Sequence, residues 1–308
     1  MQRIESHGLS RRGRAHDDNQ DHYAIATLNK SLRLHRTNLT LDDDTRVHGN
    51  NQGHLFLVAD GLGSGTQPDR ASGVAIDSIV TYVLNEMPWT HMMGAEPEDV
   101  RIALMDAVRN AQTDLRRRST TPGPDMGATL TLAFLCWPDL YIAHVGNGRA
   151  YLHREGDLER LTTDHTVAEV RAQIGGQVEP AKQPVLWNAL GGRTLDVHPE
   201  VQHFELREND TLLLVTDGVA RERDESRIRA VLEGNGAAEE LCQNLVDVDG
   251  QDDRTAIVVR CLPTDRSGCV ETHVDPSALE EGSQEPVPSM LKRIGRAILR
   301  VPAFRLAQ

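Results

Sequence analysis

Leu55-Phe56-Leu57-Val58-Ala59-Asp60-Gly61 is an apolar run that ends in an acidic residue and a glycine. Its length and continuous apolar character predict a β-strand that is buried in a sheet. The aspartate would then place a carboxylate at the mouth of that sheet. The glycine would let the backbone carbonyl approach a ligand closely. Residues 212–218 repeat the arrangement and end in Asp217 and Gly218.

Two further acidic elements lie beside predicted strands. Asp252 and Asp253 come just before the last strand, and Asp21 precedes a short strand over residues 23–26. Each element alone is an ordinary turn signal, but four of them at strand ends predict one convergent carboxylate cluster. Closely packed carboxylates raise one another's pKa, so such a cluster needs divalent cations. Paired cations would also activate water, which is the chemistry of a phosphoester hydrolase.

The remaining patterns predict the fold class. Short apolar runs predict strands over residues 54–59, 129–136, 140–145, 211–216 and 255–261. Helical spacing predicts helices over about 69–87, 97–117, 227–232 and 237–246. Because the helices do not alternate regularly with strands, we expect an α+β fold of two antiparallel sheets with helices packed outside. The polar residues 28–53 predict a long loop or a poorly ordered hairpin insertion.

The 308 residues divide by composition into three parts. Residues 1–262 form the predicted catalytic domain, 263–288 an acidic disordered linker and 289–308 a basic amphipathic tail. Three roles remain open for the tail: no role, docking on the acidic domain of the same chain, or weak contact with an anionic membrane surface. The net charge of −13 argues against nucleic acid as a partner.

The cellular compartment is predicted from three features. The four cysteines form no CxxC pair, and buried thiols suit a reducing environment. Residues 1–10 lack the apolar segment of a secretory signal. No stretch approaches the ~20 apolar residues that span a bilayer. We therefore expect a cytoplasmic protein.

Short motifs run through most of the chain in a characteristic order. They include Asp60-Gly61-Leu62-Gly63, Gly146-Asn147-Gly148-Arg149 and Thr216-Asp217-Gly218. The other blocks occupy residues 13–21, 70–72, 126–130, 161–165, 189–192 and 252–255. In these motifs and their order the chain resembles the metal-dependent serine/threonine protein phosphatases of the PP2C or PPM type, in their compact bacterial form.

The resemblance implies a four-layer α-β-β-α sandwich with two Mn²⁺ or Mg²⁺ ions between the sheets. Asp60 would bridge both ions, Asp217 and Asp252 would complete the first, and the Gly61 carbonyl would bind the second. Asp21 would orient a water molecule that attacks phosphorus directly, without a phosphoenzyme. The substrates implied are phosphoserine and phosphothreonine in proteins, in opposition to a Ser/Thr kinase. A monomer is expected.

The chain departs from the family pattern at two site positions. His16 stands where the family has an arginine that pairs with the substrate phosphate, and an imidazole cannot form a guanidinium's bidentate contact. Arg12 or Arg14 could take that role. Asn147 replaces an aspartate that helps related bacterial enzymes to bind a third metal, which makes such a site doubtful here. Residues 166–184 correspond to the family's flap.

Two alternatives to an active phosphatase follow from the same residues. A pseudophosphatase would keep the fold for binding or regulation, and the changes at His16 and Asn147 favour it slightly. An interaction module with structural Asp-Gly turns would show no dependence on metal. The complete set of predicted metal ligands favours an enzyme over both.

Overall fold

The computed structural model describes residues 3–33, 46–63, 68–87, 96–118, 126–176, 184–192 and 196–264. All of them belong to one compact unit that ends at Thr264. The predicted tail and all but the first two residues of the predicted linker lie outside the described residues. The division of the chain into three parts therefore stays a prediction. No helix among the described residues is long and apolar enough to cross a membrane.

Two antiparallel sheets form the centre of the fold. The first contains, in spatial order, β1 (Arg3–Arg11), β12 (Arg254–Leu262), β11 (Thr211–Val215), β7 (Arg149–Arg154) and β8 (Asp157–Arg160). The second contains β10 (Glu200–Glu205), β6 (Asp139–Val145), β5 (Leu130–Cys136), β3 (Arg46–Leu62), β4 (Gly127–Ala128) and β9 (Leu190–Gly191), and β2 (Asp21–Arg33) pairs with β3. The predicted antiparallel architecture is confirmed.

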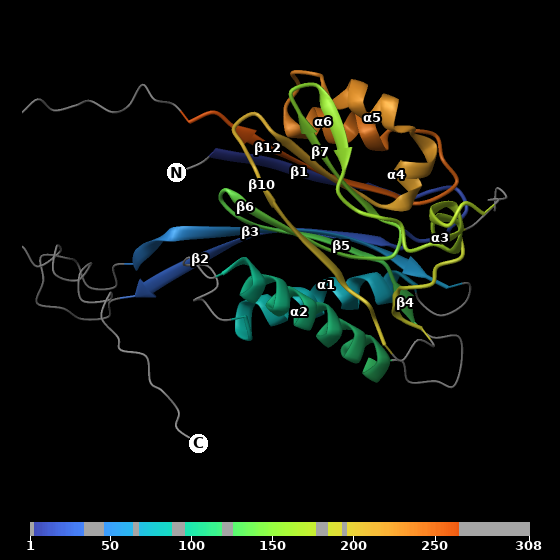
Figure 1. Cartoon of the computed structure of the whole chain (residues 1–308), viewed down its shortest axis with the longest axis horizontal. Coiled ribbons are helices and arrows are strands. Elements are labelled where there is room, and N and C mark those ends of the chain that lie inside the picture. The colour runs from blue at the N-terminus through green and yellow to red at the C-terminus, as the bar shows by residue number, and fades with distance from the viewer. Residues whose placement is uncertain are drawn as a thin grey trace, which may run out of the picture. The chain divides into compact units, whose positions relative to one another are not determined.

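Helices cover the outer face of each sheet, as Figure 1 shows. The seven-stranded sheet packs against α1 (Pro68–Asn85) and α2 (Pro97–Arg118). The five-stranded sheet packs against α4 (Asp217–Glu222), α5 (Glu225–Leu232) and α6 (Ala238–Val246). The order of layers is helix, sheet, sheet, helix, which confirms the four-layer α-β-β-α sandwich.

The alternation of side chains along β3 explains where its acidic end lies. Leu55 and Leu57 pack in the core beneath α1 and α2, whereas Phe56 and Val58 pack in the core between the two sheets. Successive side chains of a strand point to opposite faces, so Asp60 shares the face of Phe56 and Val58. The apolar core between the sheets therefore ends at a carboxylate.

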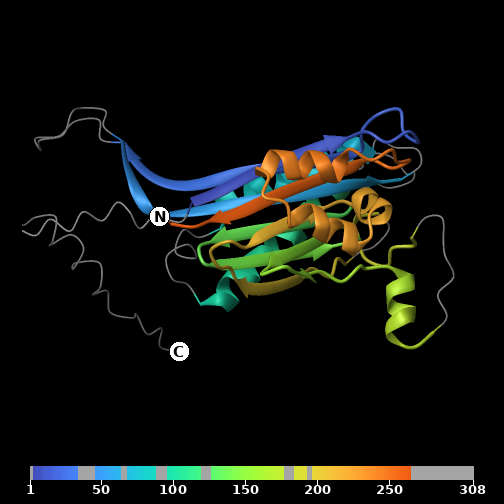
Figure 2. The same cartoon turned by 90° about the horizontal axis from the view of Figure 1, so that it is seen from above.

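Several sequence predictions need correction. For residues 28–53, predicted as a loop or a hairpin insertion, the described parts are the paired ends of a long β2–β3 hairpin, which Figure 2 shows from above. The strand predicted over residues 23–26 is consequently much longer. The sequence reading also missed β1, β7, β8 and β10, because none of them is a continuous apolar run. The two long helices and two short helices predicted from spacing are confirmed to within about two residues at each end.

The predicted flap segment begins with a short helix, α3 (Val167–Gln173), which Figure 2 shows to one side of the sandwich. The hydroxyl of Thr166 caps it by accepting a hydrogen bond from the Glu169 amide at 3.0 Å. The free cysteines among the described residues are Cys136, Cys242 and Cys261, and only the last two are fully buried.

Candidate active site

The two sheets meet at a carboxylate on β2. Strand pairing sets Asp21 directly opposite Asp60. The other sheet contributes Thr216 and Thr255, whose hydroxyls each donate a hydrogen bond of 2.7 Å to Oδ2 of Asp21. Asp21 is buried, and its second oxygen, Oδ1, has no hydrogen-bond partner among the described residues. Asp21 therefore links the two sheets to each other at one end of the sandwich.

The surroundings of Asp21, Asp60 and Asp217 disfavour the ionised form of their carboxyl groups. Burial raises the pKa of Asp21 to about 7, against the opposing effect of its two threonine partners. The pKa of Asp60 is raised well above its ordinary value by burial and by the charges of Asp21, Asp217 and Asp252. Burial also raises the pKa of Asp217 to about 6. A bound cation would relieve all three groups, because positive charge favours the ionised form.

Asp217 begins α4 at the end of β11, and its carboxylate has two polar partners on its Oδ2 atom. Asn147 donates a hydrogen bond from Nδ2 at 2.7 Å. Arg221, one helical turn further along, forms an ion pair at 2.8 Å. The same guanidinium reaches Oδ2 of Asp252 at 3.0 Å. Arg221 therefore links the two carboxylates that were predicted to hold one metal ion.

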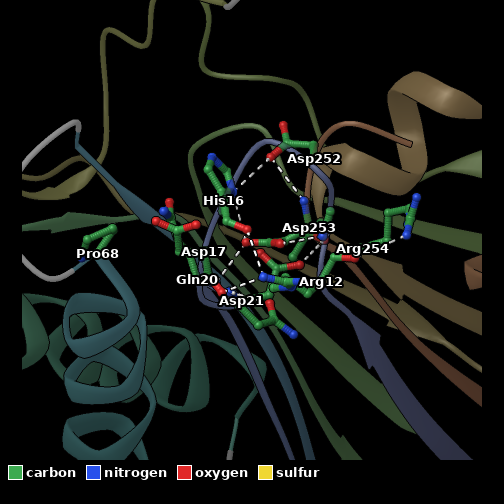
Figure 3. A network of polar contacts seen from close by, with 12 residues as sticks. Arg12, His16, Asp17, Gln20, Asp21, Pro68, Asp252, Asp253 and Arg254 are labelled. Atoms are coloured by element: carbon green, nitrogen blue, oxygen red, sulfur yellow. Dashed lines mark hydrogen bonds and ion pairs between the residues drawn. The ribbon is translucent and has the colours of Figure 1, made fainter. Parts of the chain in front are cut away.

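Asp253 fixes the loop between β1 and β2 in place (Figure 3). Its buried carboxylate accepts hydrogen bonds from the backbone amides of Gly13 at 2.7 Å and Gln20 at 2.8 Å. It also contacts Nδ1 of His16 at 3.0 Å. These contacts set the His16 ring beside Asp252, with 4.0 Å between Nδ1 and Oδ1. The sequence had identified Asp253 only as one member of the acidic pair before the last strand.

Two glycines allow the segments of the site to come this close. A Cβ atom on Gly61 would lie 2.0 Å from the carbonyl oxygen of Pro68 at the start of α1. A Cβ atom on Gly218 would lie 1.9 Å from the carbonyl oxygen of Asp253. No other residue fits either position without movement of the backbone. The Asp-Gly pairs singled out in the sequence are thus required by packing as well as by turn geometry.

The predicted site residues surround one cavity of about 520 Å³. Its lining consists of His16, Gln20, Asp60, Gly61, Leu62, Gly63, Asn147, Pro184, Leu186, Asp217, Arg221 and Asp252. All the residues proposed as metal ligands are present. Asp21 is not in the lining and lies beneath the site. Pro184 and Leu186 bring the end of the flap segment to the cavity's edge.

The donor atoms of this cavity suit a hard divalent cation. Carboxylate and carbonyl oxygens are the ligands that Mg²⁺ and Mn²⁺ prefer. Buried oxygens of Asp21 and Asn147 also have no partner among the described residues. Within that described part of the chain, however, no three acidic, histidine or cysteine side chains are spaced to enclose a metal ion. The guanidinium of Arg221 is paired with the carboxylates of both Asp217 and Asp252, two of the proposed ligands.

The arginines offered by the sequence as phosphate ligands have other roles. Arg12 donates hydrogen bonds to the backbone carbonyls of His16 and Asp17, at 3.2 and 2.5 Å. Arg14 forms an exposed ion pair with Asp249. Neither lines the cavity, so the prediction that one of them replaces the family's arginine finds no support. Arg221 does line it, and its spacing of four residues from Asp217 was the signal that the sequence reading overlooked.

Comparison with known proteins decides the family. The model of the protein phosphatase 2C family matches residues 33–247. The chain belongs to the protein phosphatase 2C family. The serine/threonine protein phosphatase PstP of Mycobacterium tuberculosis is 26% identical to this phosphatase 2C chain over 223 residues, which are 68% of the chain and 41% of PstP. The chain therefore spans about two fifths of the length of that curated relative.

Other relatives agree with this family and its fold. The serine/threonine phosphatase stp of Listeria welshimeri is 26% identical over 216 residues, which are 67% of this phosphatase 2C chain and 83% of stp. The catalytic domain of PstP, solved in complex with two manganese ions, superimposes with a TM-score of 0.64 at 23% identity. That match covers 84% of this chain and 99% of the solved one. The family and the four-layer fold that the sequence motifs predicted are both confirmed.

Proposed function

We propose that this chain hydrolyses phosphoserine and phosphothreonine side chains of proteins with the help of two bound divalent cations, Mn²⁺ or Mg²⁺. The observation that supports this most is the convergence of Asp60, Asp217 and Asp252 on one cavity from distant parts of the chain. Burial and the charges of Asp21, Asp217 and Asp252 raise the pKa of Asp60, which cations would offset. Family membership and the relatives named above point to the same activity.

The ligand assignment is the one that the family resemblance implies, and every residue it names lines the cavity. Asp60, Asp217, Asp252 and the Gly61 carbonyl would hold the two ions. Bound divalent cations would neutralise these carboxylates and activate water for attack on phosphorus. Asp21, held rigidly through its Oδ2 atom, has Oδ1 left to orient such a water.

His16 is proposed as a hydrogen-bond donor to the substrate. The carboxylate of Asp253 accepts a hydrogen bond from Nδ1 of the ring, so Nε2 can donate to a phosphate oxygen in the cavity when the ring is the doubly protonated imidazolium. A ring held in this way provides one directed hydrogen bond at low entropic cost. Asn147 is proposed as a holder of Asp217 rather than as a ligand of a third cation, because its Nδ2 group already donates to that carboxylate.

The expected partners follow from the chemistry. A Ser/Thr kinase acting on the same proteins would supply the substrates. We propose that the protein acts as a cytoplasmic monomer. The contacts suggested for the basic tail lie outside the described residues and remain proposals.

The proposed activity is tested by release of phosphate from a phosphothreonine peptide with Mn²⁺ present. We expect turnover that stops with a chelator and returns when Mn²⁺ is restored. Asp60→Asn should lower kcat by orders of magnitude, since it removes the charge shared by both ions, while the far-ultraviolet circular dichroism spectrum stays unchanged. Asp106→Asn, on the exposed face of α2, is the matched control and should retain activity. A wild-type protein that binds Mn²⁺ but never turns over would instead be a pseudophosphatase.

A further inference from the structure

The cavity contains one fixed positive charge among the residues described as lining it, and that charge is Arg221. A phosphate monoester is dianionic at neutral pH and is bound best by a guanidinium, which can donate two parallel hydrogen bonds. His16 can donate at most one, from Nε2 and only as imidazolium, because Nδ1 is paired with Asp253. The cavity therefore contains, on α4, a side chain whose chemistry suits a phosphate group.

Arg221 is at present held by carboxylates alone among the contacts that the structure gives for it. The Nη2 atom of the guanidinium lies 2.8 Å from Oδ2 of Asp217, and the Nη1 atom lies 3.0 Å from Oδ2 of Asp252. Its side chain is 35% exposed, so no packed core fixes its orientation. Arg221 thus occupies the place where a cation would sit between these two residues.

Binding of a divalent ion by Asp217 and Asp252 requires the same oxygen atoms. The guanidinium and the ion would therefore compete, and an ion bound there would displace Arg221 from both carboxylates. Repulsion between the two positive charges would then turn the guanidinium away from the ion. Because Arg221 stays tethered to α4 at the cavity wall, the nearest favourable partner would be an anion in the cavity.

We propose that Arg221 is the substrate-phosphate ligand of this phosphatase and that divalent cations free it for that role by displacing it from Asp217 and Asp252. The proposal rests on the proposed function and assigns a residue to the binding of its substrate. It predicts two effects of opposite sign for the loss of Arg221. Affinity for the metal should rise, and affinity for phosphate should fall.

The test uses Arg221→Gln and Arg221→Lys in the full chain. Arg14→Gln is the matched control, because Arg14 is an exposed arginine paired with Asp249 outside the cavity. Calorimetric titration measures the Kd of Mn²⁺ and, at saturating Mn²⁺, the Kd of inorganic phosphate. Kinetics on a phosphothreonine peptide give kcat and KM. Arg221→Lys preserves the charge and therefore guards against a variant that folds poorly.

In Arg221→Gln we expect the Kd of Mn²⁺ to fall several-fold. The Kd of inorganic phosphate and the KM of the peptide should rise about ten- to one hundred-fold, as for loss of a charged hydrogen-bond pair. Arg221→Lys should lie between Gln and wild type, and Arg14→Gln should match wild type. An unchanged Kd for phosphate in Arg221→Gln, or a larger loss in Arg14→Gln, would overturn the assignment. Absence of turnover in the wild type would reject the proposed activity instead, whatever the phosphate titrations show.

Discussion

Replacing Asp21 with asparagine should change how the stability of the metal-free protein depends on pH. Burial raises the pKa of Asp21 from its ordinary value of 3.8 to about 7. A carboxyl whose pKa is higher in the folded state contributes full stability below about pH 4 and loses it as the pH rises through about 7. At about 1.4 kcal/mol for each pKa unit, the total loss is on the order of 4 kcal/mol, with roughly 3 kcal/mol of it between pH 5 and pH 8.

The asparagine variant removes this titration but preserves the local structure, because its amide oxygen can still accept from Thr216 and Thr255. Urea unfolding in the presence of a chelator gives the free energy of unfolding of both proteins at each pH. Their difference should shift in favour of Asp21→Asn by roughly 3 kcal/mol from pH 5 to pH 8. Burial lowers the pKa of His144 to about 4, which costs stability below about pH 6.5 in both proteins and so cancels in the difference.

Saturating Mn²⁺ should abolish most of this pH dependence, since bound cations stabilise the ionised carboxylates. The exposed Asp106→Asn variant controls for the general effect of removing one negative charge. A difference between Asp21→Asn and wild type that stays constant from pH 5 to pH 8 would refute the conclusion that burial keeps Asp21 protonated near neutral pH.

Two further predictions concern neighbouring residues. Asp253→Ala should lower the free energy of unfolding by about 3 kcal/mol, because the buried amide of Gly13 and the partly buried amide of Gln20 lose their acceptor; a loss below about 1 kcal/mol in urea unfolding would contradict the anchoring role. Asn147→Asp should add one weak Mn²⁺ site per chain in calorimetric titration, because a carboxylate replaces an amide beside Asp217; an unchanged stoichiometry would count against this.

The parts of the fold that the sequence predicts are those set by local pattern. The buried strands are continuous apolar runs, and the helices α1 and α2 present one apolar stripe each, so period and length identified them. Asp60 and Asp217 were found because each ends such a strand and precedes a glycine. The strands β1, β7, β8 and β10 are not continuous apolar runs and were missed.

The parts that the sequence could not predict depend on contacts between distant segments. Asp253 acts through the amide of Gly13, which is 240 positions away in the chain. Asp21 faces Asp60 because of the β2–β3 register, which no local pattern fixes. The position of Arg221 over Asp252 likewise follows from how α4 meets the loop before β12.

A crystal structure of the protein grown with Mn²⁺ tests the central claim most directly, because anomalous scattering locates manganese without assumptions about ligands. We predict two manganese peaks in the cavity, with Asp60 bound to both, Asp217 and Asp252 bound to one, and the Gly61 carbonyl bound to the other. The guanidinium of Arg221 should have left both carboxylates. Crystals at saturating Mn²⁺ that show no manganese at Asp60, and Arg221 still paired with Asp217 and Asp252, would contradict the account.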